Sequence, residues 1–223
     1  MEVVSTESGL YDQFARIGKA LASARRVELL DLLLQGERGV DALARASGMT
    51  VTNTSQHLQT LRMARLVDAR KEGTKVIYRV AVDDVCRFFL ALRELAGDRL
   101  AEVERLVRRY VEDRDEFEPV GRAELLERAK GGGVVVLDVR PQEEYAAGHI
   151  PGAVSVPLER LEHELASLPR DTEVVAYCRG PYCLLAPRAV ELLRARGFRA
   201  RRLADGFPEW RLAGLPVAVG DER

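Results

Sequence analysis

The chain contains, at residues 174–183, the stretch Val174-Val175-Ala176-Tyr177-Cys178-Arg179-Gly180-Pro181-Tyr182-Cys183. Its first four residues are apolar, as in a strand that is buried on both faces, and a loop shaped by Gly180 and Pro181 follows. An apolar helical pattern then runs from about residue 184 to about 196. This order predicts a parallel α/β unit with Cys178 at the carboxyl end of a strand.

The segments around this stretch predict the same architecture. A helix is expected at residues 123–130, before a run of three glycines and an apolar strand at 134–137. A further strand is expected at 200–203. Buried strands that alternate with helices are typical of an α/β sheet with largely parallel pairing.

Cys178 is the residue of this half with the clearest chemistry. Backbone N–H groups of a tight loop and the positive end of the following helix dipole both favour a thiolate, which is the nucleophilic form. Arg179 adds a positive charge that suits an anionic substrate. An inert buried cysteine is the alternative, but Gly180 and Pro181 form a loop where a core strand would continue.

The N-terminal half shows apolar residues at helical spacing instead. They predict helices over residues 10–21 and 27–34. A short helix over 40–47 is closed by Gly48, and a helix capped by Thr50 is expected to continue to about residue 63. Helix, tight glycine turn and helix form the helix-turn-helix pattern.

The outer face of this last helix carries hydrogen-bonding side chains and no acids. Thr54, Leu58 and Leu61 share its inner face, at positions i, i+4 and i+7. Polar side chains on the outer face suit base edges and phosphates in the major groove of DNA, where a carboxylate would be repelled. We therefore predict DNA contacts from Thr52, Asn53, Ser55, Gln56, Gln59 and Arg62.

A basic β-hairpin is expected directly after this helix. Residues 66–71 and 75–80 alternate like strands, and Arg70, Lys71 and Lys75 crowd the tip. Residues 45–80 contain seven basic and two acidic side chains, a local charge of +5 in a chain of net charge −1. Scattered charge on a solvated face is one explanation. A wing that contacts the phosphate backbone is the other, and its position after the helix favours it.

These N-terminal segments resemble the ArsR family of bacterial winged-helix repressors. The similarity lies at residues 21–30, in Thr54-Ser55-Gln56-His57-Leu58-Gln59-Thr60-Leu61-Arg62 and at 72–79, and extends over about residues 7–112. It implies a homodimer, held by helices near 10–21 and 83–112, that binds a double-stranded DNA operator. Residues 39–44 lack the cysteines of arsenic sensors and residues 98–112 lack the histidines of zinc sensors, so no metal or cofactor is expected.

The C-terminal half resembles the rhodanese superfamily over nearly its whole length. The similarity lies in Leu137-Asp138-Val139-Arg140, in residues 144–153, in the Cys178 loop and in residues 205–210. It implies that Cys178 accepts sulfur from thiosulfate, polysulfide or a persulfide, becomes a persulfide itself and passes the sulfur to a thiol acceptor. Arg179, Gly180, Pro181, Tyr182 and Cys183 would form the active-site loop. Asp138, Arg140 and His149 would mainly support the fold and the loop.

Two positions depart from related families. Leu184 stands where cysteine phosphatases and arsenate reductases of similar fold have arginine, which disfavours phosphoryl and arsenate chemistry. Many simple rhodaneses have no second thiol in the loop. Here Cys183 could resolve a Cys178 persulfide into a disulfide or receive its sulfur.

We therefore predict a mainly α winged helix-turn-helix domain at residues 1–112, a charged linker at 113–120 and an α/β rhodanese-like domain at 121–220. No apolar stretch approaches the roughly 20 residues of a membrane helix and the start lacks signal-peptide features, so a cytoplasmic location without membrane contact is expected. Two hypotheses follow. The protein is a regulator that senses or processes sulfane sulfur, or a sulfurtransferase whose winged helix mainly dimerises and localises it.

Overall fold

The computed structural model describes residues 2–110 and 118–220. The chain divides into two compact units, Met1–Phe89 and Leu90–Arg223, and helix α5 (Asp83–Arg99) contains the boundary. Residues 113–117 of the expected linker lie outside the described residues. Val120, at the end of that expected linker, already pairs with Leu203 in the second unit.

The helices predicted for the N-terminal half are confirmed. They are α1 (Glu2–Leu21), α2 (Ala24–Leu34), α3 (Val40–Ser47) and α4 (Val51–Met63). Helix α3 ends at Gly48, whose φ of +65° places it in the left-handed region that glycine adopts without strain. Helix α4 starts at its cap, where the Thr50 side chain accepts a hydrogen bond from the Asn53 N–H at 3.3 Å.

The core of the first unit is built mainly from leucines. Leu29, Leu30 and Leu34 of α2 are fully buried, as are Leu43 of α3 and Leu58 of α4. Because these side chains come from three helices, burying them fixes the angle between α3 and α4 and leaves the other face of α4 in solvent.

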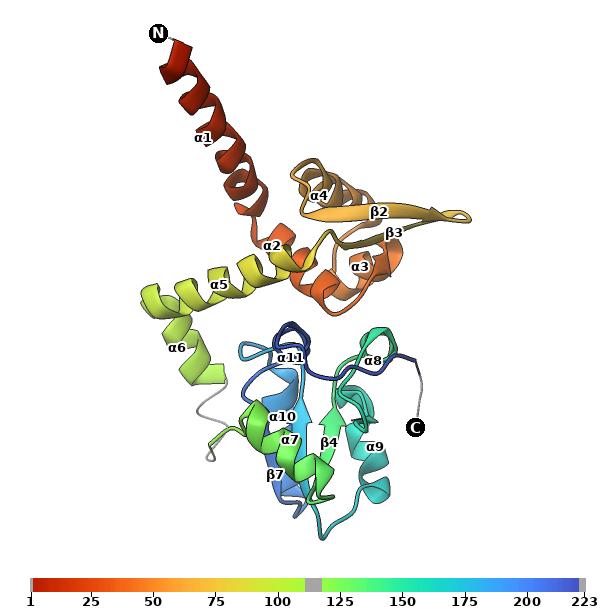
Figure 1. The fold of residues 1–223 in the computed structure, drawn as a ribbon. Coiled ribbons are helices and arrows are strands. Elements are labelled where there is room, and N and C mark those ends of the chain that lie inside the picture. Colours follow the sequence, from red (N-terminus) through yellow and green to blue (C-terminus); the bar gives the residue numbers. More distant parts are fainter. Residues whose placement is uncertain (1, 111–117, 221–223) are drawn as a thin grey trace. The chain divides into compact units, whose positions relative to one another are not determined.

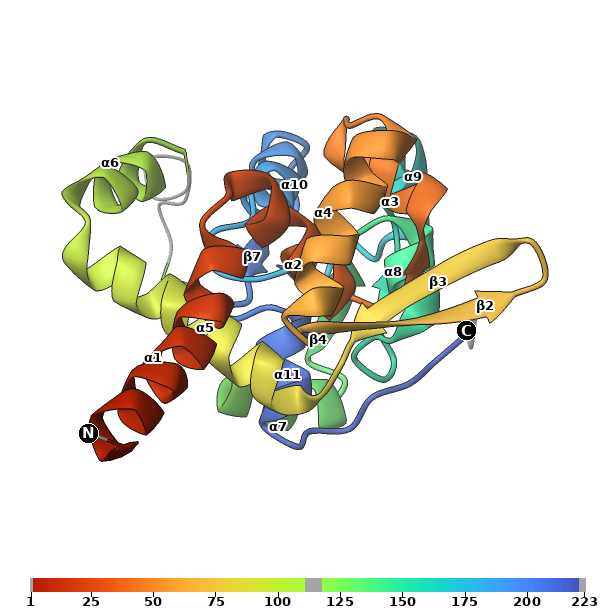
Figure 2. The ribbon, with the colours of Figure 1, turned by 90° about the horizontal axis from the view of Figure 1, so that it is seen from above.

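The expected hairpin is present as β2 (Val67–Glu72) and β3 (Lys75–Val80), paired antiparallel from Val67↔Val80 to Glu72↔Lys75. Gly73 at the turn has a φ of +57°. A strand of only two residues, β1 (Arg38–Gly39), also pairs with β3 and was not predicted, since two residues show no periodicity. The hairpin extends beyond the helices of its unit (Figure 2).

The helix expected over residues 83–112 is divided in the structure. Helix α5 ends at Arg99 and a second helix, α6 (Ala101–Tyr110), begins after Leu100. Val85, Cys86 and Phe89 of α5 are buried. Among the described helices, none combines the length and the apolar character needed to cross a bilayer.

The second unit contains a four-stranded, fully parallel sheet in the order β5-β4-β6-β7, as predicted for an α/β domain. The strands are β4 (Val134–Asp138), β5 (Val154–Ser155), β6 (Glu173–Tyr177) and β7 (Ala200–Arg202). The helices are α7 (Arg122–Lys130), α8 (Gln142–Ala147), α9 (Leu161–Glu164), α10 (Leu185–Ala195) and α11 (Phe207–Leu212). Short 3₁₀ turns at Leu158–Arg160 and Leu165–Ser167 flank α9.

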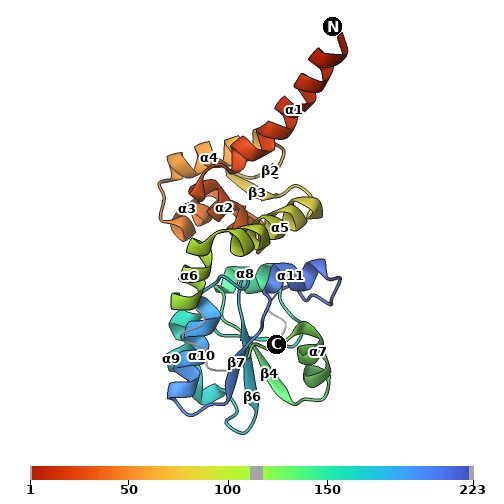
Figure 3. The same ribbon diagram turned by 90° about the vertical axis from the view of Figure 1, so that its left-hand side faces the viewer.

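Helices cover both faces of this sheet (Figures 1 and 3). Helices α9 and α10 lie on one face and α7 on the other, whereas α8 and α11 lie at the end to which the strands point. Successive residues of β6 face opposite sides: Ala176 and Cys178 join the cluster of α10, and Val175 and Tyr177 join the cluster of Trp210. The strand end therefore places a thiol on one face and a phenol on the other.

Candidate functional site

Cys178 lies at the end of β6, where the chain turns tightly around its sulfur atom. The side chain is only 3% exposed and packs in the apolar cluster beneath α10. Its Sγ lies 3.9 Å from the Gly180 carbonyl oxygen and 3.8 Å from that of Cys183. The loop is closed by a 3.0 Å hydrogen bond from the Cys183 N–H to the Gly180 carbonyl oxygen.

Gly206 holds this loop from the other side and was not among the predicted site residues. A Cβ atom at Gly206 would lie 2.2 Å from the Gly180 nitrogen and 2.3 Å from the Arg179 carbonyl carbon. The Phe207 N–H, next in the chain, donates to the Cys178 carbonyl oxygen at 3.1 Å. Only glycine allows the start of α11 to approach the sulfur loop so closely.

The two loop thiols interact directly, and their ionisation differs from the expectation. Burial raises the pKa of the Cys178 thiol well above its usual value, whereas the hydrogen bond from Cys178 is the main cause that lowers the pKa of Cys183 to about 7. Backbone N–H groups of Leu185 and Arg179 and the Arg179 charge also stabilise the Cys183 thiolate. The loop and helix terminus were expected to favour the thiolate of Cys178. At Cys178 the N–H groups of Gly180 and Ala186 do lower the pKa, but burial raises it by more.

The charge of Arg179 is held by a buried carboxylate. Its Nε lies 3.1 Å from both carboxylate oxygens of Glu144, and its Nη2 lies 2.5 Å from one of them. The Glu144 side chain, on α8, is fully buried, whereas that of Arg179 is 24% exposed. Glu144 was not predicted as a site residue. Its neighbour Tyr145 is buried as well.

Asp138, Arg140 and His149 lie on the opposite side of the strand end. Arg140 and Asp138 form a fully buried ion pair at 2.6 Å, and Arg140 also donates to the Gly148 carbonyl oxygen at 2.7 Å. The Tyr177 hydroxyl donates to Asp138. His149 Nδ1 lies 2.9 Å from the Tyr145 carbonyl oxygen. These contacts connect β4, β6 and the segment after α8.

The predicted DNA-contacting residues are mostly exposed in the first unit. On α4, Ser55 is partly buried and the rest are exposed: Thr52, Asn53, Gln56, Gln59 and Arg62. On the hairpin, Arg70, Lys71 and Lys75 are exposed. Arg70 differs from the two lysines because it forms ion pairs with Glu37, at 2.5 Å, and with Glu72. Part of its charge is therefore already neutralised.

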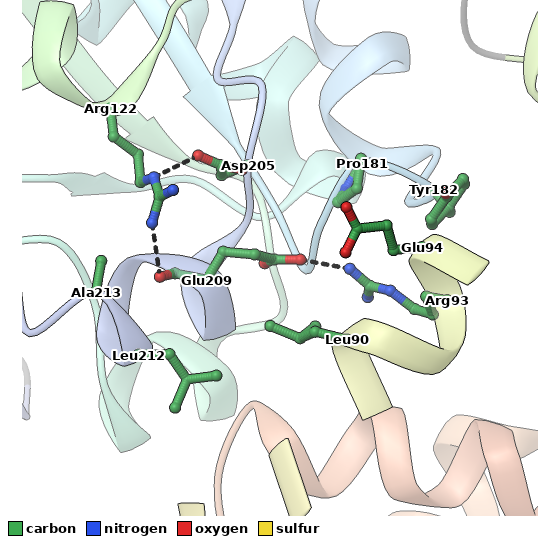
Figure 4. Close-up of a pocket in the computed structure, with 10 residues that line it drawn as sticks. All are labelled: Leu90, Arg93, Glu94, Arg122, Pro181, Tyr182, Asp205, Glu209, Leu212 and Ala213. Carbon is green, nitrogen blue, oxygen red and sulfur yellow. Dashed lines mark hydrogen bonds and ion pairs between the residues drawn. The ribbon is translucent and has the colours of Figure 1, made fainter. Parts of the chain in front are cut away.

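A polar pocket of about 510 Å³ lies in the second unit beside the sulfur loop (Figure 4). Pro181 and Tyr182 line it, whereas Cys178 does not. Arg122 pairs with Asp205 at 2.6 Å across its wall, and Glu209 pairs with Arg93. In the part of the chain that is described, no three His, Cys, Asp or Glu side chains are grouped closely enough to hold a metal ion.

The fold and these sites define a class of protein. Residues 23–69 match the family model described as "Bacterial regulatory protein, arsR family", and residues 122–213 match that described as "Rhodanese-like domain". The chain is 49% identical over 214 residues to the HTH-type transcriptional regulator Rv0324 of Mycobacterium tuberculosis, covering 96% of this chain and 94% of that one. The protein therefore belongs to the ArsR-family helix-turn-helix regulators and carries a C-terminal rhodanese-like domain.

Each half also has relatives of its own. Over 42% of its length, the chain is 50% identical to a solution structure described as the homodimeric winged helix-turn-helix DNA-binding domain of a possible ArsR-family regulator of Mycobacterium bovis. The TM-score is 0.41, and 87% of that chain is covered. A segment of 87 residues, 39% of this chain, is 32% identical to a sulfurtransferase of Allochromatium vinosum and covers 79% of it.

Proposed function

We propose that the protein is a DNA-binding transcriptional regulator whose rhodanese-like domain forms a persulfide on Cys178 and thereby senses or transfers sulfane sulfur. One observation carries this proposal. Cys178 lies at the end of a parallel strand, in a loop that turns tightly around its sulfur, on the same chain as a winged helix-turn-helix. The carboxyl ends of parallel strands are where α/β proteins place their chemistry.

The loop residues provide a route for loading sulfur. The Cys183 thiolate accepts the proton of Cys178 through the hydrogen bond between the two thiols. The Cys178 thiolate then attacks the outer sulfur of thiosulfate, and sulfite leaves with the electron pair of the broken S–S bond. N–H groups of Gly180 and Ala186 stabilise the negative charge on the Cys178 side.

The first unit supplies the DNA-binding function. As a homodimer, it would place α4 of each protomer in the major groove of one operator half-site, with the two hairpins on the phosphate backbone. Gln56 and Gln59 carry amides that can read base edges, and Lys71 and Lys75 carry charges for phosphates. Binding an operator would place the protein in the cytoplasm.

The test combines two measurements on the same sample. Full-length protein is treated with thiosulfate, its intact mass is recorded, and its affinity for operator DNA is measured at fixed salt. Gain of one sulfur at Cys178 with changed affinity supports the proposal, since coupling between two sites must appear as a free-energy difference. Cys178→Ser should abolish both changes, and Cys86→Ala, which removes the buried thiol of α5, should retain both. Absence of sulfite release and of sulfur uptake, in the wild type and in Cys183→Ser alike, would refute the proposal.

A sulfurtransferase in which the winged helix mainly dimerises and localises the chain is the second candidate. The similarity to the Allochromatium vinosum sulfurtransferase favours it. This function predicts multiple turnovers with thiosulfate and a thiol acceptor, lost in Cys178→Ser, while operator affinity stays unchanged by sulfur loading. The two candidates thus differ in the response of DNA binding.

A further inference from the structure

We propose that Cys183 is a second catalytic residue, which attacks the inner sulfur of the Cys178 persulfide, closes a Cys178–Cys183 disulfide and releases sulfide. The inference rests on the proposed function, because the step needs a persulfide on Cys178. It adds an end state: the thiol pair becomes oxidised, and the sulfur that was taken up leaves in reduced form.

The loop geometry places the two sulfur atoms for this reaction. The Cys178 and Cys183 thiols are close enough for each to shift the pKa of the other. The Cys178 Sγ also lies 3.8 Å from the Cys183 carbonyl oxygen, and the Cys183 N–H is fixed to the Gly180 carbonyl oxygen at 3.0 Å. The backbone of the loop therefore keeps both thiols in one small space, so that attack is effectively intramolecular.

The surroundings of the two thiols assign their roles. Cys183 is partly exposed, whereas Cys178 is 3% exposed. Backbone N–H groups of Leu185 and Arg179 and the charge of the Arg179 guanidinium, which is paired with Glu144, lower the pKa of Cys183. These groups stabilise negative charge on Cys183. The more exposed thiol is thus the attacking thiolate, and the buried one carries the sulfur under attack.

The step balances without an external oxidant. After loading, Cys183 is a thiol and the Cys178 persulfide is an anion, and the proton passes from Cys183 to the outer sulfur of the persulfide. The Cys183 thiolate then attacks the inner sulfur. A bond forms between the two cysteine sulfurs, the bond between inner and outer sulfur breaks, and the outer sulfur leaves as HS⁻. Two thiols are oxidised by two electrons, and the sulfane sulfur is reduced to sulfide.

Thiosulfate is the appropriate probe, because loading releases sulfite and only the second step releases sulfide. Reduced full-length protein, freed of reductant, is mixed with thiosulfate, and sulfite, sulfide and intact mass are followed. We expect one sulfite and one sulfide per chain, and a product lighter than the reduced protein by two hydrogens. Peptide mapping should find the disulfide between Cys178 and Cys183.

Variants separate this inference from the proposed function. Cys183→Ser and Cys183→Ala should both release no sulfide, and the sulfur that is taken up should remain on Cys178. Cys86→Ala, the matched loss of a thiol outside the loop, should release sulfide like the wild type.

Two results would overturn the role of Cys183 and leave the proposed function standing. One is a wild-type protein that keeps its persulfide and releases only sulfite. The other is sulfide release that persists in both Cys183 variants. If neither wild type nor variants release sulfite or gain sulfur, the proposed function itself fails, and this inference fails with it.

Discussion

Replacement of Asp138 by asparagine should destabilise the rhodanese-like domain strongly. The Asp138 carboxylate accepts hydrogen bonds from the Arg140 N–H and Nε at 3.0 Å, from its Nη2 at 2.6 Å, and from the Tyr177 hydroxyl. Both side chains of the ion pair are fully buried, so the variant removes the main opposing charge of a guanidinium that lies away from water. Loss of one partner of a buried pair costs about 3–5 kcal/mol. In the variant, Arg140 retains its hydrogen bond to the Gly148 carbonyl oxygen and its contact with the Phe207 ring. We therefore expect the free energy of unfolding to fall by about 3 kcal/mol, the lower end of this range.

The single tryptophan of the chain makes this measurement specific. Trp210 is 3% exposed in the core of the second unit, so its fluorescence during urea denaturation reports the unfolding of that unit. At an m-value of about 1.5 kcal/mol/M, a loss of about 3 kcal/mol lowers the urea midpoint by about 2 M.

Glu124→Gln is the matched control, because its ion pairs with Arg128 and Arg201 are partly exposed and should contribute less than about 1 kcal/mol. If Asp138→Asn shifted the urea midpoint as little as Glu124→Gln does, the buried ion pair would not stabilise this domain.

Three further results are expected. Alkylation of Cys183 by a small haloacetamide should accelerate as pH rises through about 7, because the reactive thiolate exists above its pKa. Cys178→Ala should raise the pH midpoint of this acceleration, because it removes the main cause that lowers the pKa of Cys183. An unchanged pH midpoint would contradict the hydrogen bond between the two thiols. Lys71→Ala should weaken binding to most DNA sequences and reduce the slope of log binding constant against log salt concentration by about 1. Arg70→Ala should have the smaller effect, because Arg70 is already ion-paired. Equal effects of the two variants in titrations at several salt concentrations would refute this difference. Gly206→Ala should abolish sulfur uptake measured by mass, because the Cβ of the new alanine would lie 2.2 Å from the backbone of the sulfur loop. Full sulfur uptake by this variant would show that the loop can shift to accommodate the Cβ.

Local signals explain why the elements could be predicted. The Thr50 cap and the left-handed Gly48 fix the ends of α3 and α4 within a few residues of sequence. Apolar runs likewise identify β4 and β6, because both strands are covered on both faces. Such features depend on neighbours in the chain, so the sequence contains them directly.

The candidate site depends on contacts between distant segments, and there the sequence was less informative. Glu144 and Arg179 are 35 residues apart, and nothing near Glu144 indicates a buried partner for a guanidinium. The contact of Gly206 with the sulfur loop likewise joins α11 to the end of β6. The net pKa shift at Cys178 was not predictable, since loop amides and a helix terminus are visible in the sequence but the depth of burial is not.

The burial of Cys178 also determines which molecules can reach it. With only 3% of the residue exposed, a donor must bring its sulfur to a thiol that offers little accessible surface. Thiosulfate and linear polysulfides end in a sulfur atom narrow enough to do so, whereas the disulfides of folded proteins are flanked by backbone on both sides. Steric exclusion would thus let the protein respond to a scarce inorganic sulfur species among far more abundant protein disulfides, with no need for a recognition pocket of high affinity.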